Sequence, residues 1–481
     1  MTNVIISLVY SIIVVSIVLV IVAENRNPLK AFPWILVVLF VPIVGVLLYY
    51  LFGEDLRRER MVNKRVFRNI VQAPLLFNKH FPKKEQDYPD KKLQQHLIEE
   101  IGNSPRIPYE QLDIFTEGKS MFHTLLQDLK EARHHIHLEY YAFIDDEIGN
   151  AVAEILIAKR RQGVKVRVIY DDVGSWGVKR QFWKKMKKAG IEVYPFMRVV
   201  FPFFSSRVNF RNHRKIIIID SRIGYIGGMN IADRYYKGNN LGIWRDTHFR
   251  VTGEAVQSFQ SNFLLLWNVV SRRIVKIKDY FPDLSADKTL TLAQKDVNRP
   301  SLQVISGAPT GKWRTIELAL ISIIARAKKS IDIETPYFLP TKGILDSLCL
   351  AALSGIRIRL LIPEEGDNKY VHIASMSYIE EMLEAGVEVY FYQQGFLHSK
   401  IISVDNEIAI GGSANLDFRS LEHNFEIVSV FYDATTSKRL TEIFEKDLLA
   451  SPPSLSLERW RKRSFVKKFT ESVMRLFSPL L

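Results

Sequence analysis

Two short segments of the chain carry a histidine, a lysine and an aspartate at the same H-x-K-x4-D spacing. The residues are His213, Lys215 and Asp220 in the first segment and His398, Lys400 and Asp405 in the second. Both segments are rich in isoleucine and are expected to be strands, in which residues two apart project from one face. Each histidine therefore shares a face with its lysine. Because an imidazole can act as nucleophile, acid or base near neutral pH and a lysine neutralises an anion, the pairs predict chemistry on an anionic group.

One such match would be weak evidence, because a single histidine is often a core residue and a lysine is usually a solvated cation. Fewer than about 0.2 matches are expected in such a chain by chance. Two matches are much stronger, and each precedes a small-residue turn that ends in an asparagine, GGMN at 227–230 and GGSAN at 411–415. Burying two cations and two imidazoles together is costly without an anion, and a phosphodiester would supply one.

The two segments lie within a longer internal repeat. Residues 136–143 (IHLEYYAF) resemble 331–338 (IDIETPYF), 163–169 (GVKVRVI) resemble 355–361 (GIRIRLL), and 189–194 (AGIEVY) resemble 385–390 (AGVEVY). A period of about 190 residues is too long for a solenoid, so each copy must be a lobe with its own core. Short β-branched runs alternate with helical stretches, which predicts an α/β fold of two lobes, at 111–290 and 300–450, each a mixed β-sheet flanked by helices.

The charge and the cysteine content limit the kinds of partner and of metal site that the chain can have. The 481 residues include 66 Lys and Arg against 52 Asp and Glu, a net charge of +14, which predicts an anionic partner. The hydrophobic fraction of 47% and the charged fraction of 25% are those of a globular protein. The single cysteine, Cys349, excludes an internal disulfide and a zinc site built on several thiolates.

The first 53 residues predict a transmembrane hairpin. Residues 3–23 and 34–52 carry no charge and are long enough to cross a hydrocarbon core as helices, joined by a turn at 24–33. A cleaved signal peptide and two buried core helices are the alternatives, disfavoured by the missing N-terminal basic residues and the missing polar faces. Residues 54–110 are then a basic juxtamembrane linker. Its basic residues include Arg57, Arg58, Arg60, Lys64, Arg65 and Arg68. By the positive-inside rule, they predict a multi-pass protein of the cell membrane with its lobes in the cytoplasm.

The last residues, 455–481, alternate basic and apolar side chains and predict a basic amphipathic helix. Such a helix suits the headgroup region of a membrane. A terminal helix docked on the second lobe is the alternative, and the sequence leaves both open.

The paired motifs with their GGMN and GGSAN followers resemble the phospholipase D superfamily. Within it, the Asn-Arg-Asn-Pro loop at 25–28 and the Phe-Gly at 52–53 are similar to the bacterial cardiolipin synthases. The resemblance implies two lobes related by a pseudo-twofold axis that share one active site. It also implies catalysis without a metal or a cofactor.

The resemblance further implies a division of labour. His213 attacks phosphorus and forms a covalent phosphohistidine, while His398 protonates the leaving alcohol. Lys215, Lys400, Asn230 and Asn415 hold the non-bridging oxygens, Ser413 supports the turn of the second motif, and Asp220 and Asp405 support their strands. Asp246 and Glu426 fix the tautomers of the histidines that precede them in their own copies. Glu139 and Glu334 occupy equivalent strand ends, and their role stays open.

The implied reaction is phosphatidyl transfer between two phosphatidylglycerol molecules, which gives cardiolipin and glycerol. Phosphatidylglycerol and anionic membrane lipids are the expected partners, and nucleic acid is not. The motifs do not separate this reaction from a membrane-bound phospholipase D that hydrolyses its substrate or uses another acceptor alcohol. A third alternative is a non-catalytic or nucleic-acid-binding member, which the two intact motifs disfavour.

Overall fold

The computed structural model describes residues 2–23, 28–41, 44–45, 49, 92–199, 210–273, 275, 277–281, 299–309 and 311–481. The chain divides into two units. The first comprises Met1–Arg65 with Val199–Val208, and the second comprises Val66–Arg198 with Asn209–Leu481.

The first unit contains two helices, α1 (Thr2–Ala23) and α2 (Pro28–Phe40). Helix α2 begins at Pro28, so the predicted turn at 24–33 is too long at its C-terminal end, because a proline is well accommodated in the first turn of a helix. Within the part of the chain that the structure describes, no helix is both long and apolar enough to cross a membrane. The expected spans therefore remain predictions, and most of 42–91, including the basic run, lies outside the described residues.

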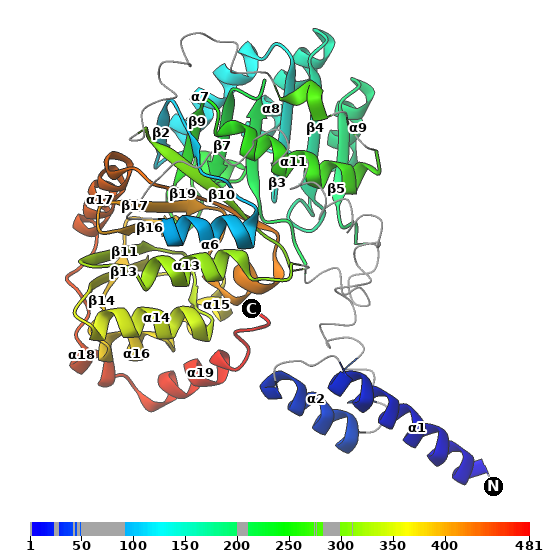
Figure 1. Cartoon of the computed structure of the whole chain (residues 1–481), viewed down its shortest axis with the longest axis vertical. Helices are drawn as coiled ribbons and strands as arrows, with labels where there is room; N and C mark the ends of the chain where they lie inside the picture. Colours follow the sequence, from blue (N-terminus) through cyan, green and yellow to red (C-terminus); the bar gives the residue numbers. More distant parts are fainter. Residues whose placement is uncertain are drawn as a thin grey trace. The chain divides into compact units, whose positions relative to one another are not determined.

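The second unit contains both lobes (Figure 1). The strands of lobe 1 are β2 (Leu112–Phe115), β3 (His135–Tyr140), β4 (Lys165–Asp171), β5 (Glu192–Phe196), β6 (Lys215–Ile219), β7 (Ile223–Gly227), β8 (Trp244–Arg245) and β9 (His248–Thr252). Its helices are α7 (Gly118–Glu131), α8 (Glu147–Arg161), α9 (Arg180–Lys188), α10 (Asp233–Tyr236) and α11 (Val256–Ser271), and a 3-10 helix spans Ile277–Tyr280. The main sheet has the order β2-β9-β7-β6-β3-β4-β5.

Lobe 2 has the same plan. Its strands are β10 (Ser301–Gly307), β11 (Ser330–Glu334), β12 (Phe338–Leu339), β13 (Arg357–Pro363), β14 (Glu388–Tyr392), β15 (Phe396–Leu397), β16 (Ile401–Val404), β17 (Ile408–Gly412), β18 (Leu416–Asp417) and β19 (Glu426–Phe431). Its helices are α13 (Thr315–Ile324), α14 (Lys342–Leu353), α15 (Lys369–Met376), α16 (Ile379–Glu384), α17 (Ala434–Leu449), α18 (Leu457–Arg461) and α19 (Phe465–Arg475), with a π-helix at Arg419–His423.

The strand orders confirm the duplication. Read from β14, the second sheet runs β14-β13-β11-β16-β17-β19-β10, which matches β5-β4-β3-β6-β7-β9-β2 position by position. In both sheets the first three strands are parallel and the rest are antiparallel. The predicted mixed sheet is therefore correct, because the helical crossovers α8 and α14 connect parallel strands whereas short turns connect antiparallel ones.

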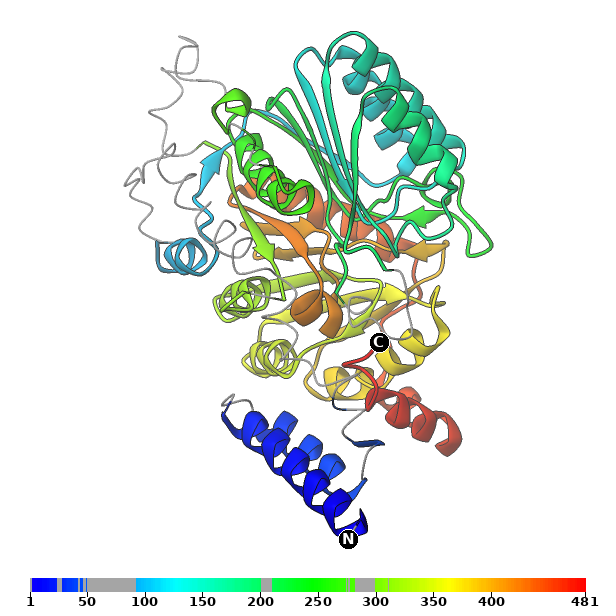
Figure 2. The same ribbon diagram turned by 90° about the vertical axis from the view of Figure 1, so that its right-hand side faces the viewer.

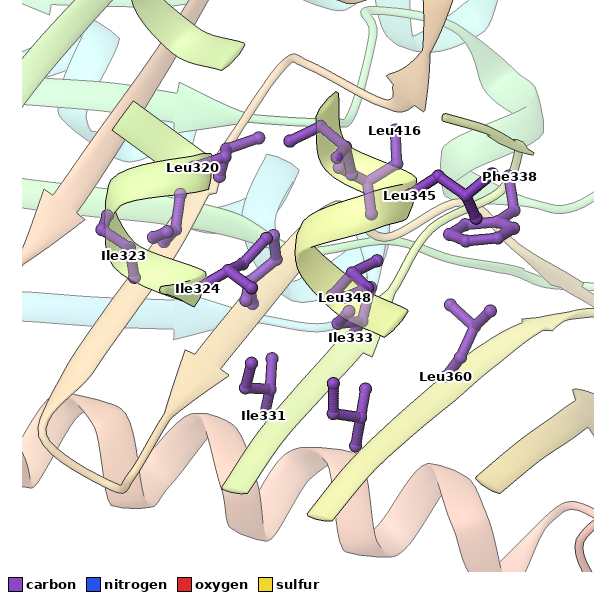
Figure 3. Packing of buried hydrophobic residues seen from close by; sticks show 14 of the residues in the cluster. Leu320, Ile323, Ile324, Ile331, Ile333, Phe338, Leu345, Leu348, Leu360 and Leu416 are labelled. Atoms are coloured by element: carbon purple, nitrogen blue, oxygen red, sulfur yellow. The ribbon is translucent and has the colours of Figure 1, made fainter. Parts of the chain in front are cut away.

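Each lobe has its own core, and a third core joins them. Alternate residues of β6 divide between two clusters: Ile217 and Ile219 face the helices α7 and α8, whereas Ile216 and Ile218 face helix α11 and the core shared with lobe 2. In lobe 2, helices α13 and α14 pack on β11 and β13 (Figure 3). The shared core contains Phe249 of lobe 1, whose ring lies 5.1 Å from that of Phe431 of lobe 2. The lobes are thus held by an apolar interface.

Two terminal segments differ from the predicted boundaries. Residues 92–102 form α6 and 107–108 form β1 (Ile107–Pro108), both expected within the linker 54–110. Strand β1 extends the second sheet by pairing with β10, and α6 contacts α13, so this segment belongs with lobe 2. At the C-terminus the predicted single helix is broken into α18 and α19, because Ser464 caps α19 by accepting a hydrogen bond from the Lys467 amide. Figure 2 shows α19 as a separate helix beyond the second sheet.

Candidate active site

The two motif histidines lie just before equivalent strands, β6 and β16, and each is held by the other lobe. The amide of His213 donates to the carbonyl of Phe425 at 2.9 Å, and the amide of His398 donates to that of Arg245 at 2.7 Å. Strand β15, which leads into His398, pairs in parallel with β8 of lobe 1. The main chain of each lobe thus fixes the position of the opposite histidine.

The two carboxylates bond the histidines crosswise. Glu426 accepts from Nδ1 of His213 at 2.8 Å, and Asp246 accepts from Nδ1 of His398 at 2.6 Å. The expected pairing within each copy is therefore wrong. The reason is that β8 places Asp246 directly beside the segment that precedes His398, so the nearest imidazole belongs to the other lobe. With Nδ1 held, Nε2 is the nitrogen of each imidazole that is available for chemistry.

The small-residue turns make room for these carboxylates. The hydroxyl of Ser413 donates to Glu426, and it accepts from the amide of Ile427 at 3.0 Å. Gly228 holds the equivalent position in lobe 1, where a Cβ atom would collide with the carboxylate of Asp246. The glycine is thus required by the close approach of that side chain.

Both motif lysines are buried, and each bonds the carbonyl of its own histidine. Nζ of Lys215 donates to the His213 carbonyl at 2.6 Å, and Nζ of Lys400 donates to the His398 carbonyl and lies 2.9 Å from its Nδ1. Burial lowers the pKa of Lys215 to about 7, and the charge of Lys400 adds to this effect. Burial also lowers the pKa of Lys400 to about 8. Two desolvated cations in each other's field favour the binding of an anion.

The imidazoles and their carboxylates differ in electrostatics. Burial lowers the pKa of His213, although Glu426 opposes the shift. For His398, burial and the charges of Lys400 and Lys215 hold the pKa well below its ordinary value. Burial raises the pKa of Asp246, whereas His213 and Lys215 outweigh burial at Glu426 and hold its pKa below the ordinary value. Both shifts favour the neutral form of the imidazole at neutral pH.

The two asparagines already have protein partners. Asn230 accepts from the Ala142 amide at 3.1 Å and donates to the hydroxyl of Tyr235 at 2.8 Å. Nδ2 of Asn415 donates to Asp417 at 2.9 Å. Each amide group has a second Nδ2 hydrogen, so these bonds do not preclude a bond to a phosphate oxygen.

The motif aspartates lie away from the histidines, at the far ends of β6 and β16. Asp220 accepts from the amides of residues 133, 134 and 135, each at 2.8 Å. Asp405 accepts from those of residues 328, 329 and 330 at 2.7 to 2.9 Å. Both have positive φ, 54° and 56°, which aspartate tolerates better than most residues. Each aspartate carboxylate thus links the turn after its own strand to the start of the neighbouring strand.

Glu139 and Glu334 are buried behind the histidines rather than beside them. Glu139 accepts from Nδ2 of Asn212 at 3.0 Å and lies 3.6 Å from the guanidinium of Arg214. Glu334 lies 3.4 Å from Arg245, and burial raises its pKa to about 8. Both carboxylates bind residues adjacent to the histidine and carboxylate segments.

The structure also places aromatic and basic residues at the site that the motifs did not indicate. The ring of Tyr141 lies 4.9 Å from that of His213, and Tyr235 and Trp244 lie 5.7 and 5.1 Å from that of His398. The guanidinium of Arg234 lies over both Tyr235 and Trp244. The sequence carried one signal for it: an arginine follows each motif asparagine by four residues, as Arg234 and Arg419.

Two family models match the chain. The model described as "Cardiolipin synthase, PLD-like domain" matches residues 125–267 and 320–448, and the model described as "Phospholipase_D-nuclease N-terminal" matches 9–54. Cardiolipin synthase 2 of Bacillus anthracis is 39% identical over 471 residues, covering 96% of this chain and 89% of that protein. The major cardiolipin synthase ClsA of Bacillus subtilis is 36% identical over 490 residues, covering 100% and 99%. The chain belongs to the cardiolipin synthase family.

Among solved structures, the phosphatidylserine synthase of Haemophilus influenzae is similar in fold, with a TM-score of 0.59 and 16% sequence identity. The matched region covers 81% of this chain and 100% of the synthase chain. This similarity supports the two-lobed fold of the family. Among the described residues, no cluster of three or more His, Cys, Asp or Glu side chains could hold a metal ion. Catalysis without a metal stays a prediction.

Proposed function

We propose that the protein is a cardiolipin synthase that transfers a phosphatidyl group from one phosphatidylglycerol to another. The observation that carries this proposal is the crossed arrangement of the site: two histidines from two lobes, each bonded at Nδ1 to the other lobe's carboxylate and accompanied by a buried lysine. Such a pair can supply a nucleophile and an acid to one phosphodiester.

In the first half-reaction, Nε2 of His213 attacks phosphorus and the bond to the glycerol oxygen breaks. His398 gives that oxygen a proton, so glycerol leaves and phosphatidyl-His213 forms. His398 is neutral in the empty site because burial and cations lower its pKa. An arriving phosphodiester offsets those cations and raises the pKa, so His398 takes up its proton as substrate binds.

In the second half-reaction, a hydroxyl of the second phosphatidylglycerol gives its proton to His398 and attacks phosphorus. The P–N bond breaks, its electron pair returns to His213, and cardiolipin is released. Lys215, Lys400, Asn230 and Asn415 stabilise the non-bridging oxygens throughout. Ser413, Asp246 and Glu426 position the imidazoles, while Asp220, Asp405, Glu139 and Glu334 brace the strands.

Hydrolysis, or use of another acceptor alcohol, is the competing outcome at the same phosphohistidine. Incubation of the purified chain with labelled phosphatidylglycerol in detergent micelles separates the two. Cardiolipin with free glycerol is the expected result. Phosphatidic acid alone would instead indicate a phospholipase D, and no turnover would contradict both enzymatic functions.

We also propose that the chain is a multi-pass protein of the cell membrane whose lobes lie in the cytoplasm. The support comes from the sequence. Residues 3–23 and 34–52 carry no charge, and the basic residues cluster after the second uncharged run rather than in the turn between the two runs. The N-terminal family match over residues 9–54 includes most of the first run and all of the second.

The C-terminal helices give further support to a membrane contact. Helix α19 docks on lobe 2, where Arg475 pairs with Glu381 at 3.0 Å and Met474 packs against the core of the lobe. Most apolar side chains of α19 and of the residues after it remain exposed. The exposed residues are Phe465, Val466, Phe469, Val473, Leu476, Phe477 and Leu480. An apolar stripe beside Lys467 and Lys468 suits an anionic bilayer surface.

A further inference from the structure

Arg234 of lobe 1 lies beside His398 of lobe 2. Its guanidinium is 5.3 Å from the ring centroid of Tyr235 and 5.3 Å from that of Trp244. The same two rings contact the imidazole of His398, at 5.7 and 5.1 Å. Arg234 and His398 therefore share two aromatic neighbours on one side of the active site.

One donor of Arg234 is unused, although Tyr235 and Asp367 stabilise its charge and hold its pKa above the ordinary value against the effect of burial. Its Nε is buried without a hydrogen-bond partner among the described residues. The adjacent carboxylate, Asp233, is instead bonded to Lys237 at 2.9 Å and to the amide of Ile148 at 2.9 Å. A largely buried guanidinium with an unused donor favours an anionic ligand, and the planar fork of arginine fits phosphate oxygens.

Among the described residues, an arginine over two aromatic rings that contact a motif histidine is found on the His398 side of the site. The register of the two sheets makes Arg419 the counterpart of Arg234, since each lies four residues after its motif asparagine. By the same register, Ser420 and Asn424 replace Tyr235 and Trp244 in lobe 2. Asn424 donates to Glu426 at 3.3 Å. The His398 side is therefore chemically distinct from the His213 side.

This asymmetry matters for the second half-reaction. The acceptor hydroxyl must approach phosphorus from the side opposite the bond to His213, where His398 can take its proton. In phosphatidylglycerol, only a three-carbon glycerol separates that hydroxyl from the acceptor's own phosphodiester. The second phosphate therefore enters on the side where Arg234 lies. We propose that Arg234 binds the phosphodiester of the acceptor lipid.

The proposal rests on the proposed phosphatidyl transfer. It adds a reason why the enzyme would select an anionic lipid as the acceptor. Glycerol leaving the donor carries no phosphate, and neither does water. Binding by Arg234 thus favours an anionic lipid acceptor over both in the competition for phosphatidyl-His213.

Arg234→Gln tests the proposal in the full-length chain in detergent micelles. Two reactions are compared: cardiolipin formation from phosphatidylglycerol, and exchange of labelled free glycerol into phosphatidylglycerol, which uses the same phosphohistidine with an uncharged acceptor. Cardiolipin formation should fall about tenfold to a hundredfold, the loss typical of a charge-assisted hydrogen bond. Glycerol exchange should fall at least about tenfold less, and the share of phosphatidic acid should rise.

Two variants control the comparison. Arg234→Lys keeps the charge without the fork and should give an intermediate ratio of cardiolipin to glycerol exchange, which also serves if the glutamine variant fails to fold. Arg419→Gln, on the His213 side, should lower both reactions to the same extent. An unchanged ratio in folded Arg234→Gln, or a selective loss of cardiolipin in Arg419→Gln instead, would overturn the proposal. If the unaltered chain forms no cardiolipin, the transfer function itself is wrong.

Discussion

At the scale of single residues, the active site depends on which carboxylate reaches which imidazole. Glu426 holds His213 and Asp246 holds His398, so each catalytic pair combines the two lobes. A carboxylate on Nδ1 fixes the tautomer and stabilises the imidazolium that forms during proton transfer. The crossed pairing therefore predicts that each carboxylate affects the half of the chemistry performed by the opposite lobe.

His213→Ala should abolish formation of the phosphatidyl-enzyme, and Glu426→Gln should slow it by about a hundredfold or more. Asp246→Asn should impair proton transfer by His398 and resemble His398→Ala, which should still form the adduct from a substrate with an activated leaving group. Trapping of lipid-labelled protein after quenching in alkaline detergent, in which the P–N bond survives, measures the difference. The opposite pattern, with adduct lost in Asp246→Asn and retained in Glu426→Gln, would contradict the crossed assignment.

The buried lysines predict a dependence on pH. The pKa values of Lys215 and Lys400 in the empty site are about 7 and about 8, lowered chiefly by burial. Both lysines are charged below pH 7, so neither takes up a proton when a phosphodiester binds there, and His398 is the group that does. As pH rises through 7 and then 8, binding must also recharge one lysine and then both, so the fall in affinity with pH should steepen by about tenfold per pH unit for each lysine.

The competitive inhibition constant of dimethyl phosphate, a monoanion over this whole range, measures the effect. Lys215→Arg keeps its charge and should remove the first part of the fall. A constant that does not change up to pH 9 would contradict the prediction.

At the scale of elements, strands β6 and β16 each have the proposed catalytic residues at one end and, at the other, an aspartate that links the strand to its neighbour. Strands β6 and β16 begin beside the lysines and end at Asp220 and Asp405, whose carboxylates bond three successive amides before β3 and β11. We therefore expect the aspartates of the H-x-K-x4-D pattern to stabilise the sheet and to affect the reaction only through the position of the strand.

Asp220→Asn should destabilise the chain by about 1 to 2 kcal/mol, because the amide keeps one acceptor oxygen and tolerates positive φ but loses the charge. Asp405→Asn should have a similar effect, and the two should add because the turns are far apart in the fold. Urea unfolding measures the stability, and the turnover of the folded fraction should change little. Loss of turnover at unchanged stability would instead assign the aspartates to the chemistry.

Helix α19 has an apolar side that the fold leaves exposed. With Cys349→Ser as a cysteine-free background, an environment-sensitive dye on Phe469→Cys should shift to shorter wavelength when the chain is reconstituted in phosphatidylglycerol vesicles. The same dye on Glu458→Cys, an exposed position of α18, is the control and should not shift. Equal spectra at the two positions would contradict insertion of α19.

At the scale of the whole molecule, the catalytic unit is one body built from two lobes. The shared core around Phe249 and Phe431 and the pairing of β8 with β15 both join the two lobes. Since each histidine is held by the other lobe, a separated lobe lacks a complete site.

Because the lobes have their own cores, deletion of residues 1–52 should leave them folded, with cooperative thermal unfolding by circular dichroism. Turnover of phosphatidylglycerol in detergent micelles should persist, whereas turnover in vesicles should fall because the chain is no longer anchored. Complete unfolding would show that the N-terminal segment is part of the catalytic core.

The sequence by itself determined the features that depend on the spacing of residues within one segment or on the similarity of two segments. The isoleucine-rich runs at 215–219 and 401–404 indicated strands. The duplicated segments indicated two equivalent lobes, and the H-x-K spacing indicated which residues share a face. It also placed Asp220 and Asp405 at strand ends, away from the chemistry. All of these relations lie within one segment or between two copies of it.

Only the tertiary structure decided the pairings between segments distant in the chain. Glu426 follows His213 by 213 residues, and nothing in the period of either strand shows that they meet. Nothing in the sequence of residues 92–108 indicated that they pack on lobe 2. A short helix and an edge strand can join any sheet that offers unpaired backbone groups and an apolar face. Arg234 was visible only as a repeated spacing. Its place beside His398 depends on Tyr235 and Trp244, which the fold brings there by pairing β8 with β15 across the two lobes.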